Sequence, residues 1–345
     1  MQFVLICNTI KDKVIIIERN VYMKIKKIVS AALAAAMITS GALALSACSG
    51  NKTDSSSKTS SSSASAKPTE AAKKSSPAVE DLKKMGVDTS KCDLDPQITY
   101  AENEQYGFQL DKPEKGENIA VIHTTEGDIT LRLFPQYAPR TVENFIKLAK
   151  ANKYNGVIFH RVINNFMIQT GDYENQDGTG GTSAFGSAFE DEFCDKLNNI
   201  RGSVAMANSG KDTNGSQFFI NQNNKENFQK NGGFKQMQDN WKNIKAQLQK
   251  YGKDANTVPQ ILQYFGTSCY DADVVPDQIQ TLYNENGGNP SLDGAYNAGD
   301  AGHTVFAQVI DGMEVVDKIA AAKTGTNDKP VKDIKIKSVE IKEYK

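Results

Sequence analysis

The run GVIFHRVINNFMIQTGD, residues 156–172, places a single arginine, Arg161, among apolar residues and ahead of a glutamine, Gln169. Arginine is costly to bury without a partner, and the run contains no acidic residue before Asp172. Two interpretations are open: the guanidinium of Arg161 snorkels out of a core strand, or it faces a pocket and meets a substrate there. In a pocket it would supply several hydrogen-bond donors from a rigid fork that stays protonated.

Short β-rich runs surround this arginine and must position it. NIAVIHT and DITLRLF flank TEGD and predict two strands joined by a tight turn. APRTVENFIKLAKANKY predicts a helix with a proline in its first turn, and its apolar face carries Val142, Phe145, Ile146 and Ala149. Further strands are expected in GVIFHRVI, FMIQTGD, GSVAMANSG, SQFFINQ, HTVFAQVIDG and IKIKSVEIKEY, and a helix in MEVVDKIAAA. The pattern predicts a mainly β domain, a closed antiparallel barrel capped by helices.

Residues 222–302 have a different pattern. Apolar residues recur there at three- and four-residue steps and predict an amphipathic helix: Phe234, Met237, Trp241, Ile244, Leu248 and Tyr251. TVPQILQYFG and PDQIQTLYNENGG predict two more helices. We interpret the segment as a helical insertion, and we favour structural decoration over the alternative, a lobe that contacts a partner or substrate.

The N-terminal region carries an export signal. Residues 23–47 run from lysines through small apolar residues to LSAC, and resemble a bacterial lipoprotein signal peptide. The resemblance implies cleavage before Cys48, lipidation of Cys48, attachment to the cell membrane and an extracytoplasmic domain. An uncleaved membrane helix over 28–47 is the less favoured alternative. Residues 1–22 put charges ahead of a complete signal, so we expect Met23 to be the true start and the preceding piece to be a gene-start error.

Two segments separate the signal from the barrel. Residues 48–78 are rich in Ser and Lys with nothing to bury, and predict a disordered tether. Residues 79–117 form a mixed pre-domain segment to which the sequence assigns no function. After lipidation of Cys48 three cysteines remain, so at least one thiol is free or paired with another chain: Cys92, Cys194 and Cys269.

Composition argues against several function classes. The chain of 345 residues is 39% hydrophobic and 23% charged, and its formal net charge of −1 gives no basic field for nucleic acid. Three scattered histidines and five cysteines without a C-x-x-C pair argue against a metal or redox site, so we expect no metal and no cofactor. A solute-binding lipoprotein is disfavoured because the pattern predicts a barrel rather than two α/β lobes.

Several long motifs follow one another in a fixed order: FHRVINNFMIQTGD, GTGG, FEDEF, AMANSG with TNGSQFFI, and HTVF. In this order they resemble the cyclophilins, which are peptidyl-prolyl cis-trans isomerases, over roughly residues 118–344. For residues 118–345 the resemblance implies an eight-stranded barrel with two capping helices and a shallow groove on its outside. The implied partners are proline-containing unfolded or extended polypeptides, and we expect a monomer.

The chemistry of such a groove can be argued physically. An X–Pro bond has partial double-bond character and a rotational barrier of about 18–20 kcal/mol. Rotation removes the resonance, so a donor aimed at the proline nitrogen stabilises the twisted state more than the planar one. The resemblance assigns this donor to Arg161. We therefore expect an isomerase that assists the folding of exported chains; the alternative is a catalytically weak chaperone or binding module that uses the groove and the insertion.

The resemblance assigns roles to further residues. Phe166 and Gln169 join Arg161 as catalytic residues, and Gln169 would brace Arg161 or bond the substrate backbone. The implied substrate-binding residues are Met167, Ala207, Asn208, Gln217, Phe219, Leu292 and His303. His160 is expected to point inward as a satisfied core histidine.

Three departures from the family pattern lie near these residues. Thr170 replaces a glycine of the usual QGGD, beside the site. Ser291 stands where many members carry tryptophan or histidine, which removes a wall of the outer groove and argues against tight cyclosporin binding. The connection LDGAYNAGDAGHTVF is longer than usual, so the loop leading to His303 is the part of the site most open to displacement.

Overall fold

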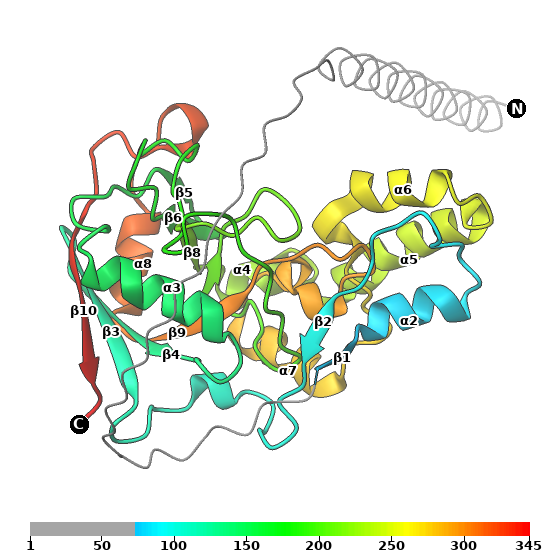
Figure 1. Cartoon of the computed structure of the whole chain (residues 1–345), viewed down its shortest axis with the longest axis horizontal. Helices are drawn as coiled ribbons and strands as arrows, with labels where there is room; N and C mark the ends of the chain where they lie inside the picture. The colour runs from blue at the N-terminus through cyan, green and yellow to red at the C-terminus, as the bar shows by residue number, and fades with distance from the viewer. Residues whose placement is uncertain (1–72) are drawn as a thin grey trace, which may run out of the picture. The chain divides into compact units, whose positions relative to one another are not determined.

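The structure is a computed structural model and describes residues 73–345 (Figure 1). The expected upstream extension 1–22, the signal peptide 23–47 and the lipidated Cys48 lie outside the described residues. No helix within the described part of the chain is long and apolar enough to cross a membrane.

Eight strands form one antiparallel sheet in the order β10-β3-β4-β9-β7-β8-β6-β5. Buried and half-exposed residues alternate along short strands such as β5, as a sheet with one face on a core requires. The strands are β3 (Asn118–Thr124), β4 (Asp128–Leu133), β5 (Arg161–Ile163), β6 (Met167–Thr170), β7 (Ser203–Met206), β8 (Phe218–Asn221), β9 (Val305–Asp311) and β10 (Ile336–Glu343).

The sheet is strongly curled, but it is not closed by hydrogen bonds, so the expectation of a closed barrel is wrong. β10 and β5 end the strand order and do not pair with each other. The chain before β5 meets the chain before β10 through one isolated bridge between Ile158 and Lys335, where Phe159 N donates to Ile334 O at 2.9 Å. The ladder stops there because β5 is only three residues long and turns at once into the hairpin with β6.

Two helices pack on the curled sheet, α3 (Pro139–Lys150) and α8 (Met313–Ala320) (Figure 1). The Phe145 ring of α3 lies 5.5 Å from that of Phe218 on β8 and 5.4 Å from that of Phe306 on β9. The helix predicted over this segment is confirmed, and its expected apolar face lies in this core.

The expected insertion is helical, and it builds a second core together with the N-terminal segment. Its helices are α4 (Lys225–Lys230), α5 (Gly233–Tyr251), α6 (Thr257–Phe265) and α7 (Asp277–Asn286). The side chains of Leu82, Trp241, Leu248 and Tyr283 are buried together in this second core. Leu82 belongs to α2 (Pro77–Lys84), which Figure 1 shows beside α5. We call α2, together with the segment from α4 to α7 and the loops within that segment, the helical lobe.

The N-terminal segment has regular structure earlier than the sequence predicts. The tether was expected to run to residue 78, but Lys73–Ser75 form β1 and α2 begins at Pro77. β1 pairs with β2 (Gln97–Thr99), and Thr99 N donates to Phe193 O at 2.9 Å. These pairings give the end of the tether and the pre-domain segment a place in the fold.

Two long connections, residues 223–288 and 294–302, each begin and end at points that lie close together. Asn223 Nδ2 donates to Gly288 O at 2.8 Å across the base of the insertion. In the connection that follows, a Cβ on Gly302 would lie 2.4 Å from Gly294 Cα, so these two backbones touch. Short 3-10 turns join the elements at η1 (Phe108–Leu110), η2 (Gly266–Cys269), η3 (Pro290–Leu292), η4 (Gly294–Tyr296) and η5 (Thr326–Asp328).

Candidate active site

The β5–β6 hairpin decides where Arg161 points. Val162 faces the core, so its strand neighbours Arg161 and Ile163 face the opposite side. Arg161 is paired with Gln169 across the hairpin, and its side chain is 43% exposed. The arginine in the apolar run is therefore not buried, and it lines a groove.

That groove has a volume of about 600 Å³. All the expected site residues except Gln217 line it, together with residues that the sequence did not single out. The lining is His160, Arg161, Phe166, Met167, Gln169, Asp177, Gly178, Ala207, Asn208, Phe219, Leu292, His303, Thr326, Asn327, Asp328 and Lys329.

The floor of the groove is apolar and continuous with a third buried cluster. Met167, Phe219 and Leu292 are buried in this cluster, and Phe166 packs against it. Phe108 of η1 lies in the same cluster. The pre-domain segment, to which the sequence assigned no function, therefore completes the packing beneath the groove.

The longer connection before His303 does not displace this residue. His303 N donates to Leu292 O at 2.9 Å, because the chain returns at Gly302 to the point it left at Gly294. The His303 ring stands edge-on to Phe219 with 5.2 Å between centroids. Its Nδ1 lies 2.9 Å from the carbonyl oxygen of Met206, which can only accept, so Nδ1 carries the proton. Burial lowers the pKa of His303, which keeps the ring neutral at pH 7.

Amide side chains order one wall. Gln169 Nε2 donates to Gln217 Oε1 at 3.0 Å, and Gln217 Nε2 donates to the carbonyl oxygens of Gly178 at 3.0 Å and Gly180 at 2.7 Å. Gln217 lines a smaller polar hollow of about 160 Å³, which shares Gln169, Ala207 and Asn208 with the groove. Gln169 thus starts a chain of amides that leads to the glycine-rich loop.

Arg161 instead lies near an acidic residue that the sequence analysis missed. Its Nε is 3.8 Å from Asp328 Oδ2, and both side chains are about half exposed. Asp328 and Asn327 both have φ of 58°, a left-handed conformation that holds the turn η5 over the groove. Such an exposed pair is weak, so the guanidinium remains available to a ligand. The turn-forming NDKP sequence was the only signal for this loop, and it carried no sign of a functional role.

His160 differs from its expected state. It is buried at 4% exposure but lines the groove, and among the described residues neither ring nitrogen has a hydrogen-bond partner. The expectation of a satisfied core histidine is therefore wrong. Burial lowers the pKa of His160, so the imidazole is neutral at pH 7.

Comparison with known proteins decides the family. The family model described as "Cyclophilin type peptidyl-prolyl cis-trans isomerase/CLD" matches residues 119–251 and 281–341. This chain belongs to the cyclophilin family. By its family and its relatives it is a peptidyl-prolyl cis-trans isomerase. The unmatched stretch between the two ranges contains α6 and η2 of the helical lobe.

Proteins similar to this cyclophilin occur in bacteria and in Cryptosporidium parvum. A "putative peptidyl-prolyl cis-trans isomerase" of Staphylococcus aureus (strain USA300) is 41% identical over 236 residues, which are 68% of this chain and 98% of that protein. A "putative bifunctional phosphatase/peptidyl-prolyl cis-trans isomerase" of Streptococcus pyogenes is 40% identical over 235 residues, 68% of this chain and 40% of that protein. A solved cyclophilin type isomerase of Cryptosporidium parvum is 24% identical with a TM-score of 0.44, over 66% of this chain and 99% of its own.

Three cysteines of this cyclophilin lie in the described part of the chain, away from the groove lining. Cys92, Cys194 and Cys269 form no disulfide with one another there. Burial raises the pKa of both Cys194 and Cys269 to about 12, so neither is a thiolate at neutral pH. The groove itself combines hydrogen-bond donors, an apolar floor and neutral imidazoles, a set suited to binding and polarising an amide.

Proposed function

We propose that this cyclophilin isomerises X–Pro bonds of exported, unfolded polypeptides, and that Arg161 stabilises the twisted amide. The observation that carries the proposal is the position of the Arg161 guanidinium, which lines a groove with the apolar floor of Met167, Phe219 and Leu292. A proline ring fits such a floor, and a charged donor beside it meets the nitrogen as its lone pair forms.

The rate enhancement follows from differential binding. In the planar ground state the proline nitrogen shares its lone pair with the carbonyl and accepts hydrogen bonds poorly. In the twisted state the lone pair is localised, so the donors of Arg161 bind it more strongly. A preorganised donor of this kind contributes a factor of about 10²–10³ to the rate.

The polar wall would hold the substrate while its bond rotates. Asn208 and Gln217 present amide groups beside the groove, and the chain from Gln169 through Gln217 to the Gly178 and Gly180 carbonyls keeps that wall in place. The flanking peptide units of an extended substrate can pair with these amides. Phe166 closes the side of the proline slot.

We propose that the enzyme is a lipoprotein that acts outside the cytoplasm as a monomer. The support is the sequence of residues 23–48, in which a basic, an apolar and a small-residue region lead to Cys48. A lipid on Cys48 would keep the isomerase where exported chains emerge unfolded. The tether between Cys48 and α2 would let the enzyme reach them.

A second candidate function is a binding or chaperone module with little turnover. It is favoured by Ser291 in η3, which lies outside the groove lining described above and leaves that side unwalled. The large helical lobe would then supply most of the contact surface. In this function the groove binds proline segments equally well in both states, without accelerating rotation.

The Arg161→Ala variant tests the proposed function. We expect kcat/KM on an X–Pro peptide to fall by about 10²–10³, because the donor to the twisted nitrogen is lost. Arg140→Ala is the matched control: Arg140 lies on α3 and pairs with exposed Glu190, so its loss should leave the rate unchanged. The free energy of unfolding should change by less than about 0.5 kcal/mol in both variants.

The outcomes separate the two candidate functions. A folded wild type that accelerates isomerisation, with an Arg161→Ala variant that does not, supports catalysis. A folded wild type that binds the peptide without accelerating isomerisation would sink the proposal and favour the binding module.

A further inference from the structure

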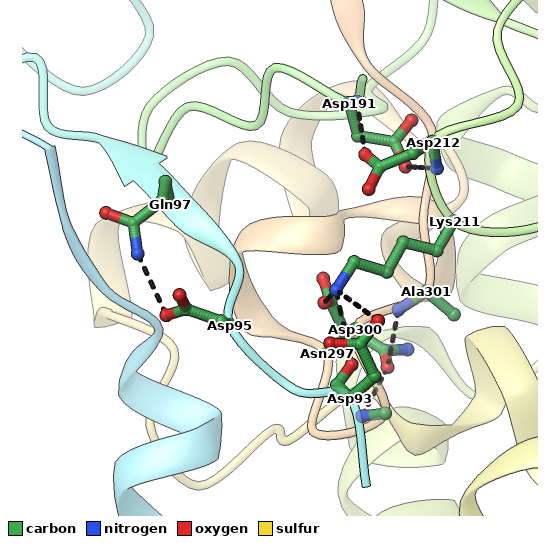
Figure 2. A network of polar contacts seen from close by, with 10 residues as sticks. Asp93, Asp95, Gln97, Asp191, Lys211, Asp212, Asn297, Asp300 and Ala301 are labelled. Carbon is green, nitrogen blue, oxygen red and sulfur yellow. Dashed lines mark hydrogen bonds and ion pairs between the residues drawn. The ribbon is translucent and has the colours of Figure 1, made fainter. Parts of the chain in front are cut away.

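A polar network joins three segments that are remote in sequence (Figure 2). Lys211 Nζ lies 2.9 Å from Asp300 Oδ2 and 3.4 Å from Asp93 Oδ2, and it donates to the Asp93 carbonyl oxygen at 3.2 Å. Asp93 belongs to the pre-domain segment, and Asp300 belongs to the long connection before His303. One lysine therefore ties both of these segments to its own loop, residues 207–214.

The loop that carries Lys211 also forms part of the groove. Asn208 lines the groove, and its Nδ2 donates to Gly302 O at 2.8 Å and to Asp191 Oδ1 at 3.3 Å. Asp191 and Asp212 bond each other reciprocally, each carboxylate accepting the other's backbone N–H at 2.9 Å. Lys211 thus sits between two points at which the loop is fixed.

The partner of Lys211 is held by the helical lobe. Asn297 Oδ1 accepts from Gly299 N at 2.7 Å and from Ala301 N at 3.3 Å, which encloses Asp300 in a tight turn. Asn297 Nδ2 donates to Gly266 O at 3.1 Å, in the turn that follows α6. The position of Asp300 therefore depends on the lobe.

Burial makes the ion pair between Lys211 and Asp300 matter more than a surface pair. The Asp300 side chain is 4% exposed, whereas that of Asp93 is 91% exposed. Burial opposes charging of Lys211, yet Asp300 and Asp93 together raise its pKa. Removing the lysine would leave a buried carboxylate without its cation, which is strongly unfavourable.

We propose that Lys211 is a positioning residue: by pairing with Asp300 and Asp93 it holds the loop of Asn208 against the helical lobe, so that the lobe sets the affinity of the groove for substrate. The inference rests on the proposed function, because Asn208 is taken to bind the substrate main chain. It assigns the lobe a task beyond decoration.

The test compares Lys211→Met, Asp300→Asn and the double variant in the full chain. We expect KM for an X–Pro peptide to rise about 5-fold in each single variant, with kcat unchanged because Arg161 and the apolar floor are untouched. The double variant should show no further rise, since both single changes break the same pair. Lys211→Arg, which keeps the positive charge, should have a KM close to that of the wild type.

Lys235→Met is the matched control. Lys235 forms an exposed pair with Asp239 on α5 and takes no part in the network, so the KM of the variant should equal that of the wild type. An unchanged KM in Lys211→Met, or equal losses of kcat and stability without a KM effect, would overturn the inference.

Amide hydrogen exchange gives a readout that does not depend on turnover. We expect residues 207–214 to exchange faster in Lys211→Met and Asp300→Asn than in the wild type and in Lys235→Met. Unchanged exchange overturns the positioning role even if the enzyme is active. Faster exchange in the two variants, together with a wild type that shows no isomerisation, would sink the proposed function while keeping the role of Lys211.

Discussion

Asp271 is a buried carboxyl in the helical lobe, and only one of its oxygens has a hydrogen-bond donor among the described residues. Asp273 N donates to Asp271 Oδ1 at 3.0 Å, whereas Oδ2 has no partner there. Burial raises the pKa of Asp271 to about 7; the hydrogen bond from the Asp273 backbone N–H opposes the rise, the charges of Asp81 and Asp273 add to it, and Lys245 opposes it. The folded state therefore keeps this proton to a higher pH than the unfolded chain does.

The consequence is a pH-dependent stability. Because the folded-state pKa is above the ordinary value of 3.8, the contribution of Asp271 to stability is lost as pH rises from about 4 to about 7. Asp271→Asn removes this loss, so its stability relative to the wild type should improve by about 3 kcal/mol between pH 4.5 and pH 8. Urea unfolding at both pH values measures it, with Asp239→Asn on exposed α5 as control. A difference that does not vary with pH would contradict the assignment.

The connection from Gly294 to Gly302 is the element that keeps the groove intact despite its length. Its two ends are in contact, so Leu292 and His303 meet as they would across a shorter loop. The contact has no room for a side chain at Gly302, where a Cβ would lie 2.4 Å from the Gly294 backbone.

Gly302→Ala should therefore open this junction. We expect the free energy of unfolding to fall by about 1–3 kcal/mol, and KM to rise because Gly302 O also binds Asn208. Gly299→Ala is the control within the same loop, since its nearest neighbour is a side-chain oxygen at 3.3 Å. Equal effects of the two changes would show that the contact with Gly294 is not the cause. Denaturant unfolding and peptide kinetics provide the comparison.

Sequence reasoning reached the strands and most of the groove because local patterns carry them. Arg161 and Gln169 lie in one hairpin whose alternation can be read directly, and the motifs place the apolar floor. It missed Asp328 and Phe108, which come to the groove only through tertiary packing. It also took the sheet as closed, because the pairing of β5 with β10 depends on the geometry of two distant strand ends.

The pre-domain segment packs against the sheet and beneath the groove. Phe108 packs beneath the groove, and Arg132 of β4 binds Glu117 at 3.0 Å while donating to Phe108 O at 3.1 Å. The pre-domain segment is therefore part of the packed enzyme.

Cys48→Ala tests the anchor in the whole protein. We expect the variant to leave the membrane fraction, with kcat/KM on an X–Pro peptide unchanged because the groove is built from residues after 73. Cys92→Ala, at a half-buried free thiol, should stay with the membrane. Retention of Cys48→Ala in the membrane fraction would favour an uncleaved helix, which the mass of the mature N-terminus would reveal.

Because each of the two long connections begins and ends at neighbouring points, the sheet can accept additional chain within them. The entropy of closing a loop rises only with the logarithm of its length, by about 0.6 kcal/mol for each doubling. A chain that starts and finishes at touching points, as between Gly294 and Gly302, can grow without moving the strands that flank it. A foreign folded domain whose own termini lie close together could therefore be grafted at an exposed turn of the helical lobe, such as Lys253 and Asp254 between α5 and α6, and the β framework would carry it as it already carries the lobe.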